Sequence, residues 1–125
     1  MLISVDTGAK VTKMPHAADF ARWRKQISDA DYEKVVEAIN AEVDANDVNT
    51  AGWIPGSDWT GSAYEPLYYA CGKNEKQAGL FFGLIVFKVL MERKDYVWGF
   101  GRFEKDGVAI RSMTYFITQV DPKTL

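Results

Sequence analysis

One stretch in the second half of the chain limits its possible folds more than any other feature. From Ala78 to Met91 the residues are apolar, apart from Lys88 and two glycines. Asn74 can cap a helix over Glu75–Arg93, because its side chain can accept a hydrogen bond from an unpaired amide of the first turn. A helix that is apolar on nearly every side has to be buried on nearly every side. We therefore expect this helix to be the central element of the core.

The two glycines of this stretch, Gly79 and Gly83, form a GxxxG pattern. The apolar run is shorter than the roughly 20 residues that cross a bilayer, and Lys88 interrupts it, so we do not expect a membrane span. Outside a membrane, the pattern indicates close packing of the helix against a neighbouring element. We expect that element to be a sheet.

Two strand-like segments follow the helix, from Tyr96 to Glu104 and from Val108 to Val120. The pair Asp106-Gly107 between them is a strong signal for a two-residue hairpin turn. That turn predicts a register in which Trp98 lies opposite Tyr115, whereas a three-residue loop with a bulge would shift the pairing by one residue. The second face of this hairpin carries Val97, Gly99, Gly101, Phe103, Ile110, Ser112, Thr114 and Phe116. Its small residues predict that the long helix packs on this face.

The N-terminus also has the pattern of a hairpin. Leu2–Val5 and Ala9–Met14 are strand-like and flank the turn residues Asp6-Thr7-Gly8. Strands at both ends with helices between them predict an α+β fold, with an antiparallel sheet of an N-terminal and a C-terminal hairpin against the long helix. With 125 residues, we expect a single domain over 1–125 that encloses one core.

Two amphipathic helices are predicted between these hairpins. The first covers 17–27, where Phe20, Trp23 and Ile27 recur at helical spacing. Ser28 then caps a second helix, whose apolar side consists of Tyr32, Val35, Val36, Ile39 and Val43. Its opposite side consists of Asp29, Glu33, Glu37, Asn40 and Asp44. Residues 29–47 hold seven acids and one lysine, so this helix is expected on the outside of the fold, with a negative surface.

The segment from Trp53 to Tyr69 combines five aromatic residues with glycines and prolines. This composition predicts a shaped loop, and Pro66 can begin a short helix over Leu67–Cys71 within it. Tryptophan and tyrosine are enriched among residues that dominate protein interfaces. The segment is therefore a candidate partner-binding surface, with the alternative that it covers one end of the core.

A second candidate site depends on the predicted hairpin register. In that register Arg102 lies opposite Arg111, a like-charge pair that is unfavourable without an anion between them. The pair is a candidate anion-binding site, because guanidinium groups bind carboxylates and phosphates well. The alternative is that Asp58, Glu65 or Glu104 neutralises the two arginines inside the fold.

The composition excludes several function classes. Cys71 is the only cysteine and His16 the only histidine, so we expect no disulfide, no metal site, no cofactor and no catalytic residue from these types. A net charge of −2 argues against direct nucleic-acid binding. The N-terminus does not resemble a signal peptide, so we expect a cytoplasmic protein that does not associate with membranes.

Two functional hypotheses follow. The first is a non-catalytic protein-binding or accessory factor that occupies the surface of a partner with basic character, as inhibitors of host defence proteins encoded by phages and mobile elements do. Its expected contact residues are Trp53, Asp58, Trp59, Tyr64, Glu33 and Glu37. The second is a protein, or a small enzyme, that binds an anion, nucleotide or sugar through the aromatic loop with Arg102 and Arg111. A homodimer or structural subunit is a further alternative.

Overall fold

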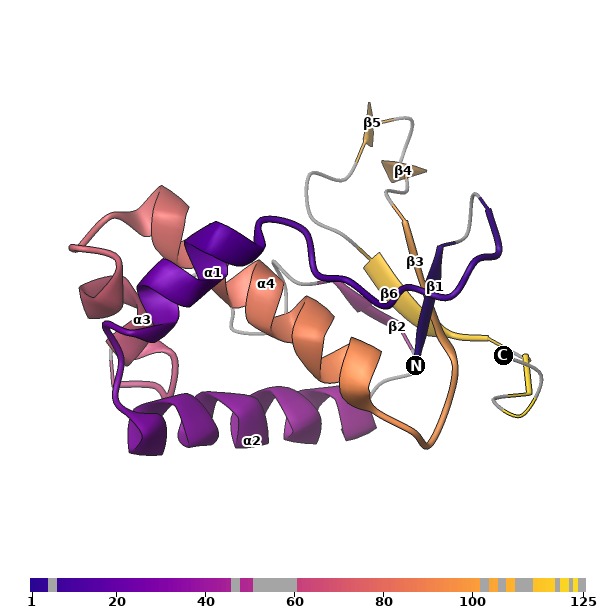
Figure 1. Ribbon diagram of the computed structural model, residues 1–125, viewed down its shortest axis with the longest axis horizontal. Coiled ribbons are helices and arrows are strands. Elements are labelled where there is room, and N and C mark those ends of the chain that lie inside the picture. The colour runs from indigo at the N-terminus through magenta and orange to yellow at the C-terminus, as the bar shows by residue number, and fades with distance from the viewer. Residues whose placement is uncertain are drawn as a thin grey trace.

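The computed structural model describes residues 1–4, 7–45, 48–50, 61–101, 104–105, 108–109, 114–118, 120–121 and 123, and at 48–50, 101, 104–105, 108–109 and 114 it describes the backbone alone. The elements are β1 (Leu2–Ser4), α1 (Ala17–Arg24), α2 (Asp29–Ala45), β2 (Val48–Thr50), α3 (Glu65–Ala70), α4 (Glu75–Glu92), β3 (Trp98–Gly101), β4 (Glu104–Lys105), β5 (Val108–Ala109) and β6 (Thr114–Ile117). The fold is α+β, with one face of the sheet against α4 (Figure 1).

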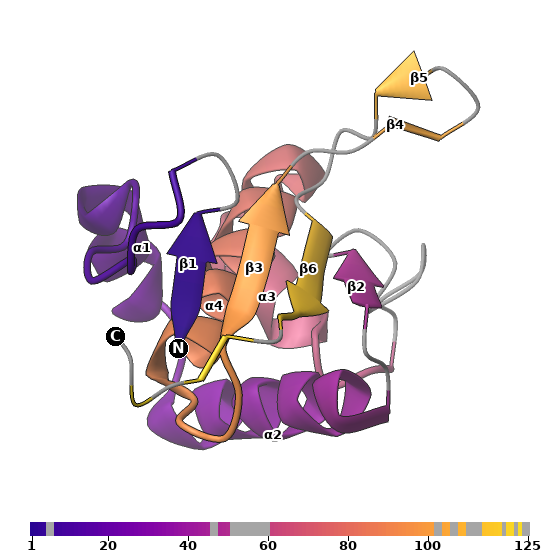
Figure 2. The same cartoon turned by 90° about the vertical axis from the view of Figure 1, so that its right-hand side faces the viewer.

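Four strands form the main sheet in the order β1-β3-β6-β2, as Figure 2 shows. β6 is antiparallel to both of its neighbours, β3 and β2. β1 is parallel to β3, with Leu2 opposite Trp98. The sheet is therefore mixed at its β1 side, because the chain passes through all four helices between β1 and β3 and returns in the same direction. β4 and β5 form a separate two-stranded ribbon that extends beyond the sheet (Figures 1 and 2).

The C-terminal hairpin has two registers. At its tip Lys105 pairs with Val108, as the Asp-Gly turn predicts. In the main sheet, however, Trp98 pairs with Ile117, so the predicted pairing of Trp98 with Tyr115 is wrong by two residues. The shift arises because four residues separate Ala109 from Thr114, whereas two separate Gly101 from Glu104. A shift by an even number keeps every side chain on its predicted face.

The face of the sheet that meets α4 is the opposite of the predicted one. Trp98 and Tyr115, each 1% exposed, belong to the main core. Phe100 on the same face contacts Phe87 of α4, with ring centroids 5.4 Å apart. The large aromatic side chains of this face fill the space beneath α4. Burying their apolar area stabilises the fold more than the closer approach of helix and sheet that the glycine-bearing face would permit.

The N-terminal hairpin is reduced to a short turn. Two contacts join β1 to the residues that follow it. Ile3 forms a β-bridge with Lys10, and Val11 donates its amide hydrogen to the carbonyl oxygen of Leu2 at 2.8 Å. Within residues 7–14 no regular strand forms. β1 is held mainly by its pairing with β3 and by the burial of Leu2 and Ile3.

The predicted central helix is confirmed as α4. The side chain of Asn74 accepts a hydrogen bond from the amide of Gln77 at 3.0 Å and so caps its first turn. Three phenylalanines of α4 contact three different parts of the fold, with ring centroids 5.2 to 5.7 Å apart: Phe81 contacts Phe20 and Trp23 of α1, Phe82 contacts Tyr64, and Phe87 contacts Phe100. Among the described helices, none is long and apolar enough to cross a membrane.

The GxxxG pattern of α4 does not mark close packing. A Cβ atom added at Gly79 or Gly83 would meet no heavy atom within 4 Å. Gly79 is exposed and Gly83 half-buried. The prediction that these glycines bring the helix against the sheet is therefore wrong, because they lie on the part of α4 that its neighbours leave open.

α2 has the predicted two-sided character. Val35, Ile39 and Val43 are at most 2% exposed and face the core. The helix begins as expected, since the hydroxyl of Ser28 accepts a hydrogen bond from the amide of Asp31 at 3.1 Å. Its outer side carries the exposed acids Glu33 and Glu37.

Candidate functional site

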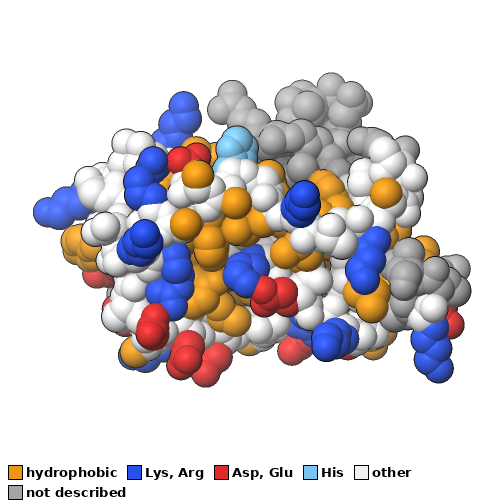
Figure 3. Space-filling model, in the orientation of Figure 1, with side chains coloured by type: hydrophobic (Ala, Val, Ile, Leu, Met, Phe, Trp, Pro, Cys, Tyr) orange, Lys and Arg blue, Asp and Glu red, His pale blue; other side chains and the backbone are white. Residues whose placement is uncertain are grey.

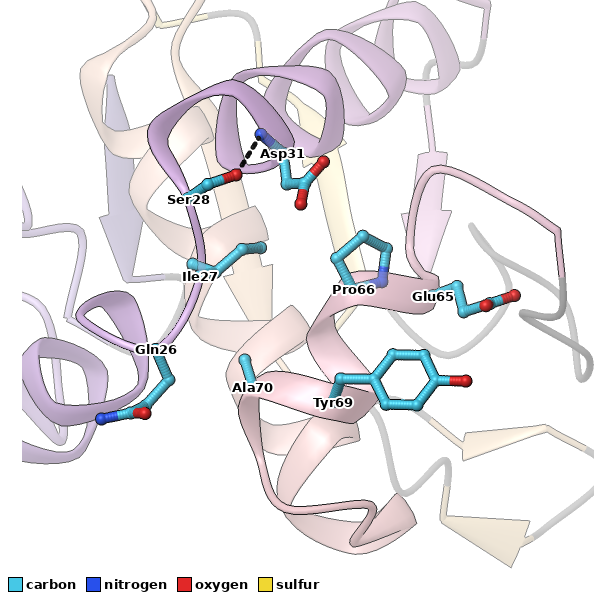
Figure 4. Close-up of a pocket in the computed structure, with 8 residues that line it drawn as sticks. All are labelled: Gln26, Ile27, Ser28, Asp31, Glu65, Pro66, Tyr69 and Ala70. Atoms are coloured by element: carbon cyan, nitrogen blue, oxygen red, sulfur yellow. Dashed lines mark hydrogen bonds between the residues drawn. The ribbon is translucent and has the colours of Figure 1, made fainter.

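A groove of about 270 Å³ lies between the start of α2 and α3, and Figure 4 shows its lining. The eight residues that line it are Gln26, Ile27, Ser28, Asp31, Glu65, Pro66, Tyr69 and Ala70. We call it the α2/α3 groove. It joins the acidic helix to the C-terminal part of the aromatic segment, the two surfaces that the sequence singled out.

The floor of the α2/α3 groove is apolar and firmly held. Ile27 and Ala70 are 7% and 8% exposed and belong to the main core. Pro66 is half-buried in the first turn of α3, where proline is favoured because its fixed backbone angle suits a helix start. The ring of Tyr69 is different, since 58% of this residue is exposed. The groove thus combines a rigid base with one exposed aromatic ring.

The wall on the α1 side is fixed by Arg24. Its guanidinium donates hydrogen bonds to the carbonyl oxygen of Ile27 at 3.2 Å and to Asp29 Oδ1 at 2.5 Å. The same group lies over the ring of Tyr32, with Cζ 4.2 Å from the ring centroid. These contacts set the corner between α1 and α2 that places Ile27 and Ser28 in the groove.

Two acidic residues line the α2/α3 groove, Asp31 from α2 and Glu65 from α3. Asp31 contributes its amide to the Ser28 cap, and among the described residues its carboxylate accepts no hydrogen bond and forms no ion pair. Figure 4 shows this carboxylate turned toward the space between α2 and α3. Glu65 accepts a hydrogen bond from the amide of Gly61, where φ is +74°. The eight described residues that line the groove include two acids and no Lys or Arg, so this lining is negative.

The outer side of α2 extends this negative character. Glu33 and Glu37 are exposed, and neither forms an ion pair within the part of the chain that the structure describes. On the face drawn in Figure 3, Lys and Arg side chains gather over α1, whereas acidic side chains lie along the edge formed by α2. The small net charge therefore hides a separation of the two signs.

Two polar side chains near the end of α2, Asn40 and Asp44, serve the fold. Arg93, just after α4, donates to Asn40 Oδ1 at 2.9 Å, to Asp44 Oδ1 at 2.5 Å and to Asp95 Oδ2 at 2.6 Å. We call these four residues the Arg93 cluster. The hydrogen bond from Arg93 holds the pKa of Asp95 below its ordinary value. The cluster ties the end of α2 to the connection between α4 and β3, so Asn40 and Asp44 are committed to structure.

Most of the residues that the sequence proposed as a site lie outside the described residues. These are Trp53, Asp58, Trp59, Arg102 and Arg111. The register of Arg102 against Arg111 and the anion site built on it therefore stay predictions. Glu65, one of the acids expected to neutralise these arginines, accepts a hydrogen bond from the amide of Gly61, and its pairing with the arginines stays a prediction as well.

Tyr64 lies inside the fold. It is 7% exposed, and its ring meets Phe82 edge-on at 5.2 Å between centroids. Burial raises the pKa of its hydroxyl. A partner could reach little of this side chain, so it is not part of the surface described above.

Sequence reasoning did not find the groove or the Arg93 cluster. In the sequence, Asp31 is only one of the seven acids of residues 29–47, and Tyr69 is only one aromatic of the segment from Trp53 to Tyr69. Arg93 and its partners Asn40 and Asp44 are separated by 53 and 49 residues, and no local pattern relates them. Only the packing of α2 and α3 on α4 brings these groups together.

Cys71 and His16, the candidates for a nucleophile and a base, lie on different elements. Cys71 is buried at the end of α3, where burial raises the pKa of its thiol, and His16 is exposed before α1. Within the described ranges, no three His, Cys, Asp or Glu side chains are placed to hold a metal ion. Comparison with protein-family models, curated proteins and solved structures found no match for this chain.

Proposed function

We propose that this chain is a protein-binding factor without a catalytic role, which acts by occupying a basic surface of a partner protein. The contact surface consists of the outer side of α2, with Glu33 and Glu37, and the adjoining α2/α3 groove. The observation that carries the proposal is that these acids are exposed and form no ion pair among the described residues. Complementary charge of this kind accelerates encounter and selects against wrong partners.

The fold supports this use of α2. The inner side of the helix is fixed by Val35, Ile39 and Val43, while the Arg93 cluster fixes its C-terminal end. The acids are therefore presented on a rigid element, and little ordering would be needed when a partner binds. An exposed aromatic ring beside them, that of Tyr69, adds a residue type that is common at interface centres.

A quantitative pull-down tests the proposal. The wild-type protein, the double variant Glu33→Gln/Glu37→Gln and the control Glu75→Gln/Glu92→Gln are immobilised and exposed to the same lysate. Both variants change the net charge equally, but the control removes acids of α4. We expect a partner that the wild type and the control retain and the α2 variant loses by about fivefold or more. Binding should also weaken as salt rises. Identical retention by all three proteins would count against the proposal.

A further inference from the structure

We propose that the α2/α3 groove receives one arginine side chain from a segment of the partner protein. The inference deepens the proposed function and rests on it, because it names the group of the partner that the acidic surface would recognise. It depends on the size of the groove, the charge of its lining and the position of one aromatic ring.

The size of the groove favours a side chain as its occupant. Its volume is about 270 Å³, slightly below the roughly 300–1,000 Å³ typical of pockets for nucleotides and other small molecules. The floor of Ile27, Pro66 and Ala70 is apolar. An arginine can lay its three methylene groups on such a floor while its charged end stays at the rim.

The charges of the lining select a cation. Asp31 lines the space from α2 and Glu65 from α3, and none of the described residues that line it is a lysine or arginine. The carboxylate of Asp31 has no partner among the described residues. A planar guanidinium offers several donors in fixed directions and can bind a carboxylate through two parallel hydrogen bonds, whereas an ammonium group acts as a single point of charge.

The third feature is the ring of Tyr69. It is 58% exposed, and in Figure 4 its ring extends along the same side of α3 as the side chain of Glu65. A guanidinium held by Glu65 could lie against this ring, as Arg24 already lies against Tyr32 at 4.2 Å elsewhere in the molecule. Charge and aromatic contact therefore favour the same occupant.

The test uses two labelled five-residue peptides and the full chain. One peptide has an arginine between two leucines, and the other has citrulline, which has nearly the same shape without the charge. Binding is measured by fluorescence anisotropy, and the contact site by amide shifts in nuclear magnetic resonance spectra. We expect the arginine peptide to bind about tenfold more tightly, as one charge-assisted contact would provide. The shifted amides should be those of Ser28, Asp31, Tyr69 and their neighbours.

Variants separate the contributions of the lining. Asp31→Asn/Glu65→Gln should remove the preference for arginine over citrulline, while Glu75→Gln/Glu92→Gln, with the same change in net charge but on α4, should keep it. The glutamine at position 65 can still accept the hydrogen bond from Gly61, and thermal unfolding checks that the groove variant is folded. Tyr69→Phe should bind like the wild type, whereas Tyr69→Ala should bind about two- to fivefold more weakly.

Three results would overturn this inference: equal affinity for the two peptides, amide shifts that map outside the groove, or free arginine amide binding as tightly as the peptide. None of them affects the pull-down comparison of the Glu33 and Glu37 variant. The occupant of the groove and the use of the outer side of α2 can therefore fail separately.

Discussion

The ring of Phe116 lies across Gly99, its partner in the neighbouring strand, on the face of the sheet opposite α4. A Cβ atom at Gly99 would stand 2.9 Å from Cζ of Phe116 and 3.2 Å from Cγ2 of Thr118. The two residues are paired directly between β3 and β6. The glycine therefore leaves the space that the aromatic ring of the adjacent strand occupies.

Replacing this glycine should destabilise the fold. In Gly99→Ala the new methyl group displaces both Phe116 and Thr118, an overpacking that typically costs about 1–3 kcal/mol. The gain from the less flexible alanine, about 0.5–1 kcal/mol, offsets only part of this cost. We expect a net loss of about 1 kcal/mol in urea unfolding. In a Phe116→Ala background most of this cost should disappear, because only the contact with Thr118 remains, and an unchanged cost there would show that the ring is not responsible.

The glycines of α4 should respond in the opposite direction. At Gly79 and Gly83 an added methyl group meets no atom within 4 Å, and neither residue has a positive φ. Alanine at each position should stabilise the protein by about 0.5–1 kcal/mol, because glycine is the poorer helix former. Urea unfolding of the two single variants and of the double variant measures this. A loss of stability in either single variant would mean that another surface closes over this part of α4.

Arg93 should be the most important charged residue for stability among those described. Its side chain is 16% exposed and contacts three acceptor residues on two segments. We expect Arg93→Met to lose about 1–2 kcal/mol, at the lower end for hydrogen bonds to charged groups because Asp44 and Asp95 are partly open to solvent. Arg93→Lys should recover part of this loss. As a reference, Arg22→Met removes an exposed pair with Asp19 and should change stability by less than about 0.5 kcal/mol.

The Arg93 cluster also predicts that the stability of the fold decreases in acid. The pKa of Asp95 is lowered in the folded state by its hydrogen bond from Arg93, so the folded protein binds this proton less readily than the unfolded chain does. The resulting stabilisation is complete above the ordinary pKa of 3.8 and is lost as the pH falls through the lower folded value. Wild type should therefore lose more stability between pH 6 and pH 2.5 than Arg93→Met. Parallel acid unfolding curves for the two proteins would contradict this.

The burial of Tyr115 predicts that the stability of the fold decreases at alkaline pH. Its burial raises the pKa of the hydroxyl well above the ordinary value of 10. Above pH 10 the unfolded chain loses this proton while the folded protein keeps it, so stability falls as the pH rises. Tyr115→Phe should reduce this loss of stability. Part of the loss should remain in the variant, because burial also raises the pKa values of Tyr32 and Tyr64. Chemical unfolding between pH 9 and pH 11 compares the two proteins. An equal decline in both would exclude a contribution from Tyr115.

The elements were predictable where one local pattern decides them. The apolar run of α4, with Asn74 at its start, indicated a buried helix, and the structure confirms it. The spacing of Val35, Ile39 and Val43 likewise identified the inner side of α2. The tip of the C-terminal hairpin followed from Asp106-Gly107. In each case residues within a few positions of one another determine the outcome, so hydrophobic periodicity and turn chemistry are sufficient.

Relations between distant segments were not predictable in the same way. Local sequence could not show that β1 joins β3 in parallel, that two additional residues shift the main register, or that α4 chooses the face of Trp98. These outcomes depend on how much apolar area each alternative buries across the whole molecule.

The sequence by itself therefore determined the α+β class, the central helix and an exposed acidic helix, because periodicity and composition act locally. Only the tertiary structure decided which acidic side chains are used inside the fold and which are free to contact a partner. It committed Asp44 to Arg93, left Glu33 and Glu37 exposed, and brought Asp31 and Glu65 into the lining of one groove. The physical reason is that a charge acquires its role from the groups around it, and for these residues those groups come from other parts of the chain.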